Sequence, residues 1–395
     1  MALDKSLDEL NEADLAALIA TGTPELKTLE YKQSLPGTSD NDRKEFFADV
    51  SSFANSAGGH LVYGMRADAG VALELMGVDA DGDSAILSME NAIRDGIAPR
   101  ITGIHCKSIK LSDTRNAVVM RIPKSYAAPH MVTFRNASRF YARSSNGKYQ
   151  LDVHEIRAVF LGSETTADRI RDFRLDRISR IRGRETPIPL LPGPCVILHA
   201  IPLTSLSGAN YDVISLKRNV KIHQTLAPLF RTFAHSSEIN FDGVLVFNGD
   251  HAQPSGGYSQ LYRNGIIEAV DAMFVAANEG HGLGKLIASQ AFEDGLFKSI
   301  RGYLAVLKSL GVDLPILIML SLTDVKGYTM GRKGNMGVFG GTPFDRDILI
   351  TQDVLLDTYD VDVPLVMKPV VDEIWNAAGF EESLYYKDGK WIGAI

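Results

Sequence analysis

A proline-rich segment, TPIPLLPGP at residues 186–194, divides this chain of 395 residues into two parts. Proline fixes its own backbone torsion and removes a hydrogen-bond donor, so neither a helix nor a central strand can run through such a segment. The chain is also longer than a typical single domain. We therefore predict two domains, one on each side of the break.

The part before the break has the pattern of a mixed fold, in which strands and helices alternate. A short amphipathic helix is expected at 6–20, where Ser6 and Glu9 have the spacing of a capping box. Strands are then expected near 28–33, 60–65, 101–110, 116–122 and 138–143, and helices near 42–55, 84–95 and 151–161. Because both hairpin and crossover connections are needed, we predict an α+β or mixed α/β domain over residues 23–162, preceded by a helix within residues 1–22.

Residues 163–186 are expected to form an Arg-rich linker helix, because seven arginines alternate with five acids there and the apolar residues have helical spacing. Such a helix is more often a solvated, ion-paired face than a phosphate-binding one, and both interpretations stay open. Residues 187–395 are predicted to form a C-terminal α/β domain of unknown role. Within it, the glycine-rich segment 326–344 is expected to be a long mobile loop.

The charge of the first domain is unevenly distributed, although the whole chain carries a net charge of −7. Residues 100–150 contain ten Lys or Arg and one acid, a local charge of +9, whereas residues 24–99 contain six basic residues and thirteen acids. An acidic segment that can hold a cation thus precedes a basic one that can hold phosphates. An unevenly charged, solvated surface is the alternative.

Cellular location is predicted from three absences. The acidic N-terminus does not resemble a signal peptide, the longest apolar runs are too short to cross a bilayer, and Cys106 and Cys195 lack the spacing of a disulfide framework or zinc finger. We therefore expect a soluble, cytoplasmic protein with no membrane partner. Assembly into a homo-oligomer stays open.

The segment ELKTLEYK at 25–32 contains the first candidate site. Alternate residues of a strand share a face, so Glu30 and Lys32 are expected to be neighbours. A carboxylate beside a lysine suits phosphodiester chemistry, since the acid holds a hard cation and the ammonium stabilises charge on the phosphate. Glu-x-Lys alone is more often structural. With Glu25 before the strand and Asp68 after the next one, three carboxylates could bind Mg²⁺ or Mn²⁺.

Three blocks of the first domain together resemble the Schlafen AlbA-like domain family, which is described as DNA-binding. They are ELKTLEYK, VSSFANSAGGHLVYGM and, at 139–156, RFYARSSNGKYQLDVHEI. In relatives that cleave structured RNA such as tRNA, the active site is a carboxylate triad. The resemblance places Glu25, Glu30 and Asp68 on that triad and Lys32 on the lysine that follows it. Asp68 departs from the pattern, since Met65-Arg66-Ala67 precedes it where relatives often have an acid directly after Gly-Val.

The third block has the residue types that contact phosphate, namely Arg139, Arg143, Ser144, Ser145, Asn146 and Lys148. The resemblance therefore implies a nucleic-acid-binding protein from bacteria, and favours a divalent-metal endonuclease that prefers RNA. Two alternatives stay open, a DNA-binding regulator without catalysis and a sensor or assembly protein acting through its C-terminal domain. No ATP is expected, because GHGLGKL at 280–286 lacks the spacing of a phosphate-binding loop.

Overall fold

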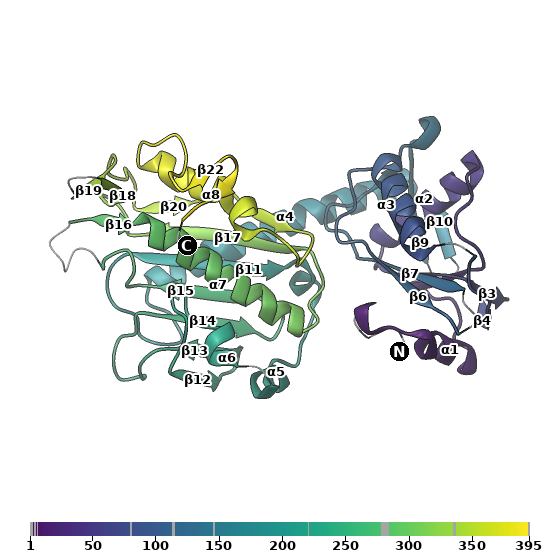
Figure 1. The fold of residues 1–395 in the computed structure, drawn as a ribbon, viewed down its shortest axis with the longest axis horizontal. Coiled ribbons are helices and arrows are strands. Elements are labelled where there is room, and N and C mark those ends of the chain that lie inside the picture. The colour runs from purple at the N-terminus through teal and green to yellow at the C-terminus, as the bar shows by residue number, and fades with distance from the viewer. Residues whose placement is uncertain are drawn as a thin grey trace. The chain divides into compact units, whose positions relative to one another are not determined.

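The computed structural model describes residues 3, 5, 7–79, 81–112, 115–144, 147–219, 221–277, 284–334 and 337–393. It has a mixed α+β fold in two compact units, Met1–Ile170 and Arg171–Ile395 (Figure 1). None of the helices in these described ranges combines the length and the apolar character that a membrane crossing requires.

The N-terminal unit contains two four-stranded sheets. The first has the order β1 (Leu29–Lys32), β2 (Gly59–Tyr63), β7 (Asn116–Ile122) and β6 (His105–Lys110). Its only parallel pair within the described strands is β1 with β2, and α2 (Asp40–Ala54) makes the crossover between them. The second sheet has the order β10 (Gly147–Gln150), β9 (Arg139–Ser144), β8 (Met131–Val132) and β5 (Ile97–Ala98). A hairpin of β3 (Met65–Asp68) and β4 (Val71–Leu75) completes the strands.

Helix α2 packs one face against the first sheet, as its apolar spacing predicted. Phe46, Val50 and Phe53 are all buried in a core shared with α3 (Gly82–Gly96) and with β2 and β7. The opposite face of the same sheet is covered by α1 (Glu12–Ala20), whose Leu15 and Leu18 are buried. Both faces of the sheet are therefore apolar at their centres, and charged residues on it are confined to its ends and edges.

The N-terminal helix begins later than the sequence predicted. Ser6 lies outside the described residues, and α1 is capped by Asn11, whose side chain accepts from the backbone N–H of Ala13. Asp14 closes the capping box by accepting from the Asn11 N–H at 3.0 Å. Leu7–Glu9, the segment that contains the expected capping glutamate, is a short 3-10 helix instead.

The pair Gly58-Gly59 forms the tight turn between α2 and β2. A side chain on Gly59 would place its Cβ 2.4 Å from the carbonyl oxygen of Thr28, and one on Gly58 would come within 2.5 Å of the Lys124 nitrogen. Both residues also have positive φ angles. The glycines are thus required for the chain to pass between its neighbours, which brings the end of α2 beside the start of β1.

Helix α4 (Val153–Arg182) is a single helix of 30 residues, whereas the sequence predicted a closing helix and a separate linker. Its last part belongs to the C-terminal unit. There, Arg174 donates to the carbonyl oxygens of Leu320 and Thr351, and Arg177 forms two hydrogen bonds of 2.7 and 2.8 Å with Glu268. These two arginines are therefore structural, and they are not available to phosphates.

The C-terminal unit is built on one antiparallel sheet. Its order is β12 (Ser236–Ile239), β13 (Gly243–Phe247), β14 (Gly257–Tyr262), β15 (Ile267–Asp271), β11 (Cys195–Pro202), β17 (Ile316–Thr323) and β20 (Ile348–Ile350), and β21 (Val354–Leu356) also pairs with β17. The segment 258–270 was expected to be one strand. It is two, β14 and β15, because the chain turns at Gly265, which has a φ of +88°.

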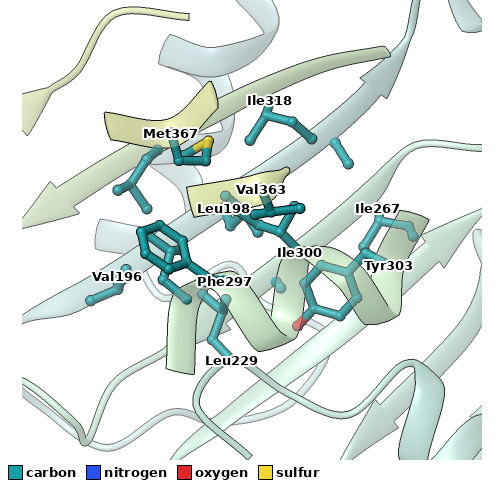
Figure 2. Close-up of a cluster of buried hydrophobic side chains, with 14 of the residues drawn as sticks. Val196, Leu198, Leu229, Ile267, Phe297, Ile300, Tyr303, Ile318, Val363 and Met367 are labelled. Carbon is teal, nitrogen blue, oxygen red and sulfur yellow. The ribbon is translucent and has the colours of Figure 1, made fainter. Parts of the chain in front are cut away.

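Helices α7 (Ser289–Ser309) and α8 (Val363–Ala377) pack on one face of this sheet and enclose the largest core (Figure 1). Figure 2 shows Phe297, Ile300 and Tyr303 of α7 meeting Val363 and Met367 of α8 and the strands beneath. The other face of the sheet packs against Ile178 and Ile181 of α4. The short helices α5 (Val213–Asn219) and α6 (Ile222–Thr225) precede β12.

The glycine-rich segment 326–344 is not a long loop. It forms the strands β18 (Thr329–Gly334) and β19 (Gly337–Gly340), and β18 also pairs with β16 (Leu286–Ala288). A final hairpin joins β22 (Tyr386–Lys387) and β23 (Lys390–Trp391). Glycine content predicted a loop here, but the neighbouring strands form hydrogen bonds with the backbone of this segment. A Cβ on Gly340 would lie 2.6 Å from Thr329 Cγ2, so a larger residue does not fit at this position.

Candidate functional site

Five charged residues meet between α2 and the two sheets of the N-terminal unit, and we call them the charged cluster. They are Glu30 and Lys32 of β1, Asp49 of α2, Arg143 of β9 and Lys148 of β10. Lys32 Nζ lies 2.7 Å from Glu30 Oε1 and 3.1 Å from Asp49 Oδ2. Glu30 Oε2 is ion-paired with Arg143, and Lys148 lies 2.8 Å from Asp49 Oδ1. Four of these five residues were candidates from the sequence.

Arg143 is the most buried member of the charged cluster, with a side chain that is 1% exposed. Its guanidinium carbon lies 4.1 Å from the centroid of the Phe53 ring, which favours a cation over its face. Its backbone N–H donates to Ser56 Oγ at 2.8 Å, so the strand itself is fixed to the end of α2. Nε and Nη1 have no hydrogen-bond partner among the described residues. Arg143 thus anchors β9 and is not presented to solvent.

The pairing favours the charged forms of Glu30 and Lys32. Burial alone would raise the pKa of the Glu30 carboxyl, but hydrogen bonds from Lys32 and Arg143 and their charges lower it below its ordinary value. Burial alone would lower the pKa of Lys32, and the charges of Asp49 and Glu30 raise it instead. A carboxylate held between two cations at these distances is a charge-assisted structural junction.

Glu25 and Asp68 lie outside the charged cluster. Glu25 Oε1 accepts from the backbone N–H of Tyr31 at 3.1 Å, and its own N–H donates to the carbonyl of Gly70 in the β3–β4 turn. Burial, and then the charge of Glu30, raises the pKa of Glu25. Asp68 is exposed at the end of β3. Within the described part of the chain, no group of three or more His, Cys, Asp or Glu is placed to hold a metal ion.

The predicted phosphate contacts divide into two kinds. Arg139 and Ser144 are exposed on β9, and Arg139 donates to Gln150 Oε1 at 3.1 Å. Lys148 belongs to the charged cluster and also pairs with Glu45 of α2. Ser145 and Asn146 lie outside the described residues. The exposed members can reach a ligand directly, whereas Arg143 and Lys148 hold the hairpin that carries them.

Asp49 is the member of the charged cluster that sequence reasoning missed. It is 2% exposed and lies within 4.0 Å of Lys32, Arg143 and Lys148. A signal for it was present, because Asp49 falls between Phe46 and Phe53 on the apolar stripe of α2. A buried acid on such a stripe requires cationic partners, and the chain supplies three.

Asn55 also has a role that its position at a helix end did not reveal. Its Nδ2 donates to the carbonyl oxygens of His130 and Tyr141, each at 2.9 Å, and its Oδ1 accepts from the His130 N–H at 2.7 Å. One amide thus fixes the end of α2 to the segments before β8 and within β9. His130 is buried, and burial lowers its pKa, while its ring is held between Pro99 O and Ser125 Oγ.

An aromatic ring between arginines lies near the start of α2. The guanidinium carbons of Arg43 and Arg135 lie 5.9 and 5.8 Å from the centroid of Phe134, and both arginines are exposed. Phe134 is held in turn by Phe47, with ring centroids 5.4 Å apart. Arg135 is also paired with Asp40 at 3.3 Å. Exposed cations beside an aromatic ring are typical of surfaces that bind nucleic-acid strands.

Comparison with known proteins identifies part of the N-terminal unit. Residues 25–152 match the family model described as Schlafen, AlbA_2. The match confirms the resemblance indicated by the three sequence blocks, and it contains the whole charged cluster. A search of the curated proteins finds none that matches this chain.

Two solved structures are similar to parts of the chain, each with a TM-score of 0.25. One is the DIP2311 protein from Corynebacterium diphtheriae, with 13% identity over 35% of this chain and 29% of that one. The other is the N-terminal domain of a protein from Nitrosomonas europaea described as related to the ATP-dependent DNA helicase RecG, with 17% identity over 37% of this chain and 97% of that one. At these identities and TM-scores, neither likeness bears on the function.

Proposed function

We propose that the N-terminal unit binds nucleic acid through its exposed basic residues. The observation that carries the proposal is the exposure of the basic side chains in residues 100–150, where ten Lys or Arg occur. Five of them, Arg100, Lys110, Lys124, Arg135 and Arg139, are exposed. The single acid counted in that segment, Asp113, lies outside the described residues. Exposed cations in a segment that contains only one acid are suited to binding a polyanion.

Three of the less exposed cations have partners within the protein. Lys107 donates to the carbonyl oxygens of Asp8 and Leu10, which fixes the N-terminal segment. Arg143 and Lys148 are bound to acids of the charged cluster. Because Arg143 is buried and both it and Lys148 are bound to acids, we assign them to positioning the hairpin that carries Arg139, and we assign phosphate contact to the exposed cations. The Schlafen AlbA-like resemblance, which implies nucleic-acid binding, is consistent with this division.

The experiment that tests binding is a titration of labelled single-stranded DNA, duplex DNA and tRNA at several salt concentrations. A plot of log K against log salt has a negative slope. Each phosphate contact removed should make this slope less steep by about one. We expect this decrease for Arg139→Gln and Arg135→Gln. Arg301→Gln, which removes an exposed arginine of α7 in the C-terminal unit, is the matched control and should leave the slope unchanged. Absence of binding to all three probes at low salt would refute the proposal.

The second candidate function is a divalent-metal nuclease, in which Glu25, Glu30 and Asp68 hold Mg²⁺ or Mn²⁺ and Lys32 lies beside the scissile phosphate. It is favoured by the geometry at β1, where Glu25 accepts from the N–H of Tyr31, the residue next to Glu30, so that both carboxylates lie at the same strand. Against it, Glu30 is already paired with Lys32 and Arg143, so a metal ion at Glu30 would experience the repulsion of two neighbouring cations.

A cleavage assay separates the two functions. The binding proposal does not depend on a metal ion, so protein treated with a chelator should bind nucleic acid as well as untreated protein does. The nuclease proposal requires that tRNA or single-stranded DNA be cleaved when Mn²⁺ is added, and that Glu25→Gln and Glu30→Gln abolish cleavage. Glu25→Gln is the more informative variant, since Glu25 has no ion pair among the described contacts that its loss would break. Cleavage that survives both substitutions excludes this site.

A further inference from the structure

A pocket of about 610 Å³ opens at one end of the central strands of the C-terminal unit. It is formed by the segment between α6 and β12 together with the residues that follow β13 and β15 and precede β14. The side chains that decide its chemistry are Phe230, Arg231, Phe233, His235, Asn248 and Met273. A volume of this size is sufficient for a small organic ligand.

The side chains around the pocket combine aromatic rings with a single arginine, and no carboxylate lines it within the described residues. Phe233 is 46% exposed. The centroid of its ring lies 5.8 Å from that of His223 and 5.6 Å from that of His235. Asn248 Oδ1 accepts from the His235 N–H at 2.9 Å, which leaves the Asn248 amide nitrogen as a donor. The pocket therefore offers a flat apolar surface, hydrogen-bond donors and a positive charge.

Arg231 is held in place by a buried acid behind it. Its Nη2 lies 3.8 Å from Asp271 Oδ2, and Asp271 is 1% exposed. Asp271 Oδ1 accepts from the backbone N–H groups of Met273 and Phe274, whereas Oδ2 has no hydrogen-bond partner among the described residues. The Arg231 side chain is 33% exposed and lines the pocket, so it is accessible to a ligand there. An arginine backed by a buried acid is oriented for an anion.

Gly256, which lines the pocket, places no side chain between Met273 and Arg231. A Cβ on Gly256 would lie 3.1 Å from Met273 Sδ and 3.8 Å from Arg231 Nη2, so a larger side chain there would fill the pocket. Phe230, at the other wall, has a φ of +61° and is held by Phe274, with ring centroids 4.3 Å apart. A non-glycine residue in this strained conformation places the next residue, Arg231, at the pocket.

We propose that this pocket binds a small molecule that carries both an anionic group and a planar aromatic ring. Arg231 binds the anion, and the ring packs against Phe233 and Met273. Phosphate or carboxylate can supply the anion, so nucleoside monophosphates and aromatic carboxylates are the two sources of this chemistry. The site lies wholly within the C-terminal unit and does not depend on the proposed nucleic-acid binding.

The experiment is calorimetric titration of the full chain with two probes, adenosine monophosphate and benzoate. Saturable binding of either supports the proposal and identifies the source of the anion. Arg231→Gln should weaken binding about tenfold or more, because a charge-assisted contact is lost. Phe233→Ala should weaken it about fivefold or more, as expected for a lost stacking partner. Gly256→Leu, which fills the pocket, should abolish binding.

Matched variants distinguish the pocket from the general surface. Arg301→Gln removes another exposed arginine, and Phe241→Ala removes a phenylalanine that is 94% exposed outside the pocket lining; both should bind the probes normally. Phe233 and Arg231 are partly exposed, so their variants are expected to fold, which thermal unfolding verifies. Two results would overturn the proposal: neither probe saturates at millimolar concentration, or binding is unchanged in both Arg231→Gln and Phe233→Ala.

Discussion

Arg143 on β9 is ion-paired with Glu30 on β1, although 113 positions separate them in the sequence. The pair joins the two sheets of the N-terminal unit across the end of α2. It also changes the interpretation of both residues, because the acid expected to bind a metal is already paired with a protein cation, and the arginine expected to bind phosphate is that cation. The charged cluster is thus first a structural junction, and a metal ion at Glu30 would have to compete with the two cations already paired with it.

Replacing Arg143 by methionine should destabilise the N-terminal unit by about 3–5 kcal/mol, the usual cost of removing one partner of a buried ion pair. The reason is that Glu30 would lose its ion pair with Arg143, and Asp49, which is 2% exposed, would lose a neighbouring cation. Urea unfolding followed by fluorescence measures the change in the free energy of unfolding.

Arg139→Gln is the control for this substitution, since Arg139 is exposed on the same strand and its loss should change stability by less than about 0.5 kcal/mol. The two variants should also differ in binding, with Arg139→Gln reducing the salt dependence and Arg143→Met acting through stability. If Arg143→Met unfolds like the wild type but binds nucleic acid more weakly, Arg143 is a direct phosphate contact.

Replacing Asn55 by alanine should also destabilise the N-terminal unit, by about 2–4 kcal/mol. Three hydrogen bonds are lost, and the carbonyl oxygens of His130 and Tyr141 lose the amide that satisfies them. Asn41, exposed in the first turn of α2, provides the control, and Asn41→Ala should change the unfolding midpoint little. Equal midpoints for the two variants would show that the amide bridge adds no stability.

Local features of the N-terminal unit were predictable from the sequence because they depend on short-range periodicity. The stripe of Phe46, Val50 and Phe53 fixed the buried face of α2, and the strand period placed Glu30 and Lys32 on one face of β1. The paired glycines predicted the turn into β2. Each of these depends on residues within one or two turns of the chain.

The partners of those residues could not be predicted, because they depend on how distant strands meet. No local pattern indicates that Arg143 would reach Glu30, or that the arginines of α4 would enter the C-terminal sheet. Charge counting treated Arg174 and Arg177 as surface residues, although both are buried or paired. Composition likewise predicted a loop at 326–344, where backbone pairing outweighs the low strand preference of glycine.

Acid should selectively weaken the contact between α4 and the C-terminal sheet. Burial would raise the pKa of Glu268, but hydrogen bonds from Arg177 and His199 lower it from 4.5 to about 2. The stabilisation from this depressed pKa is complete above about pH 4.5 and is lost as the pH falls through about 2, with a size of about 3 kcal/mol. The measurement is urea unfolding of the wild type and Glu268→Gln as a function of pH.

The free-energy gap between the wild type and Glu268→Gln should therefore be large near neutral pH and should shrink on acidification. Glu381→Gln, at an exposed position, should give a gap that is small at every pH. A gap for Glu268→Gln that stays constant down to about pH 2 would mean that Arg177 and His199 do not hold the carboxylate ionised.

The opposite pH dependence is expected for Asp271, the acid behind Arg231. Burial raises its pKa from 3.8 to about 6, so the folded protein binds the proton more tightly than the unfolded chain. This contribution to stability is complete below about pH 3.8 and is lost as the pH rises through about 6, an effect of about 3 kcal/mol. Asp271→Asn keeps an oxygen for the Met273 and Phe274 N–H groups but does not titrate.

Relative to the wild type, Asp271→Asn should thus become more stable as the pH rises from about 4 to about 7. Urea unfolding across this range measures the difference, and Asp357→Asn, at an exposed position, should show no such trend. Because Arg231 lies 3.8 Å from Asp271, Arg231→Gln should raise the pKa of Asp271 further and move the transition to higher pH. Parallel stability curves for the wild type and Asp271→Asn would show that burial does not raise the pKa of Asp271 within this range.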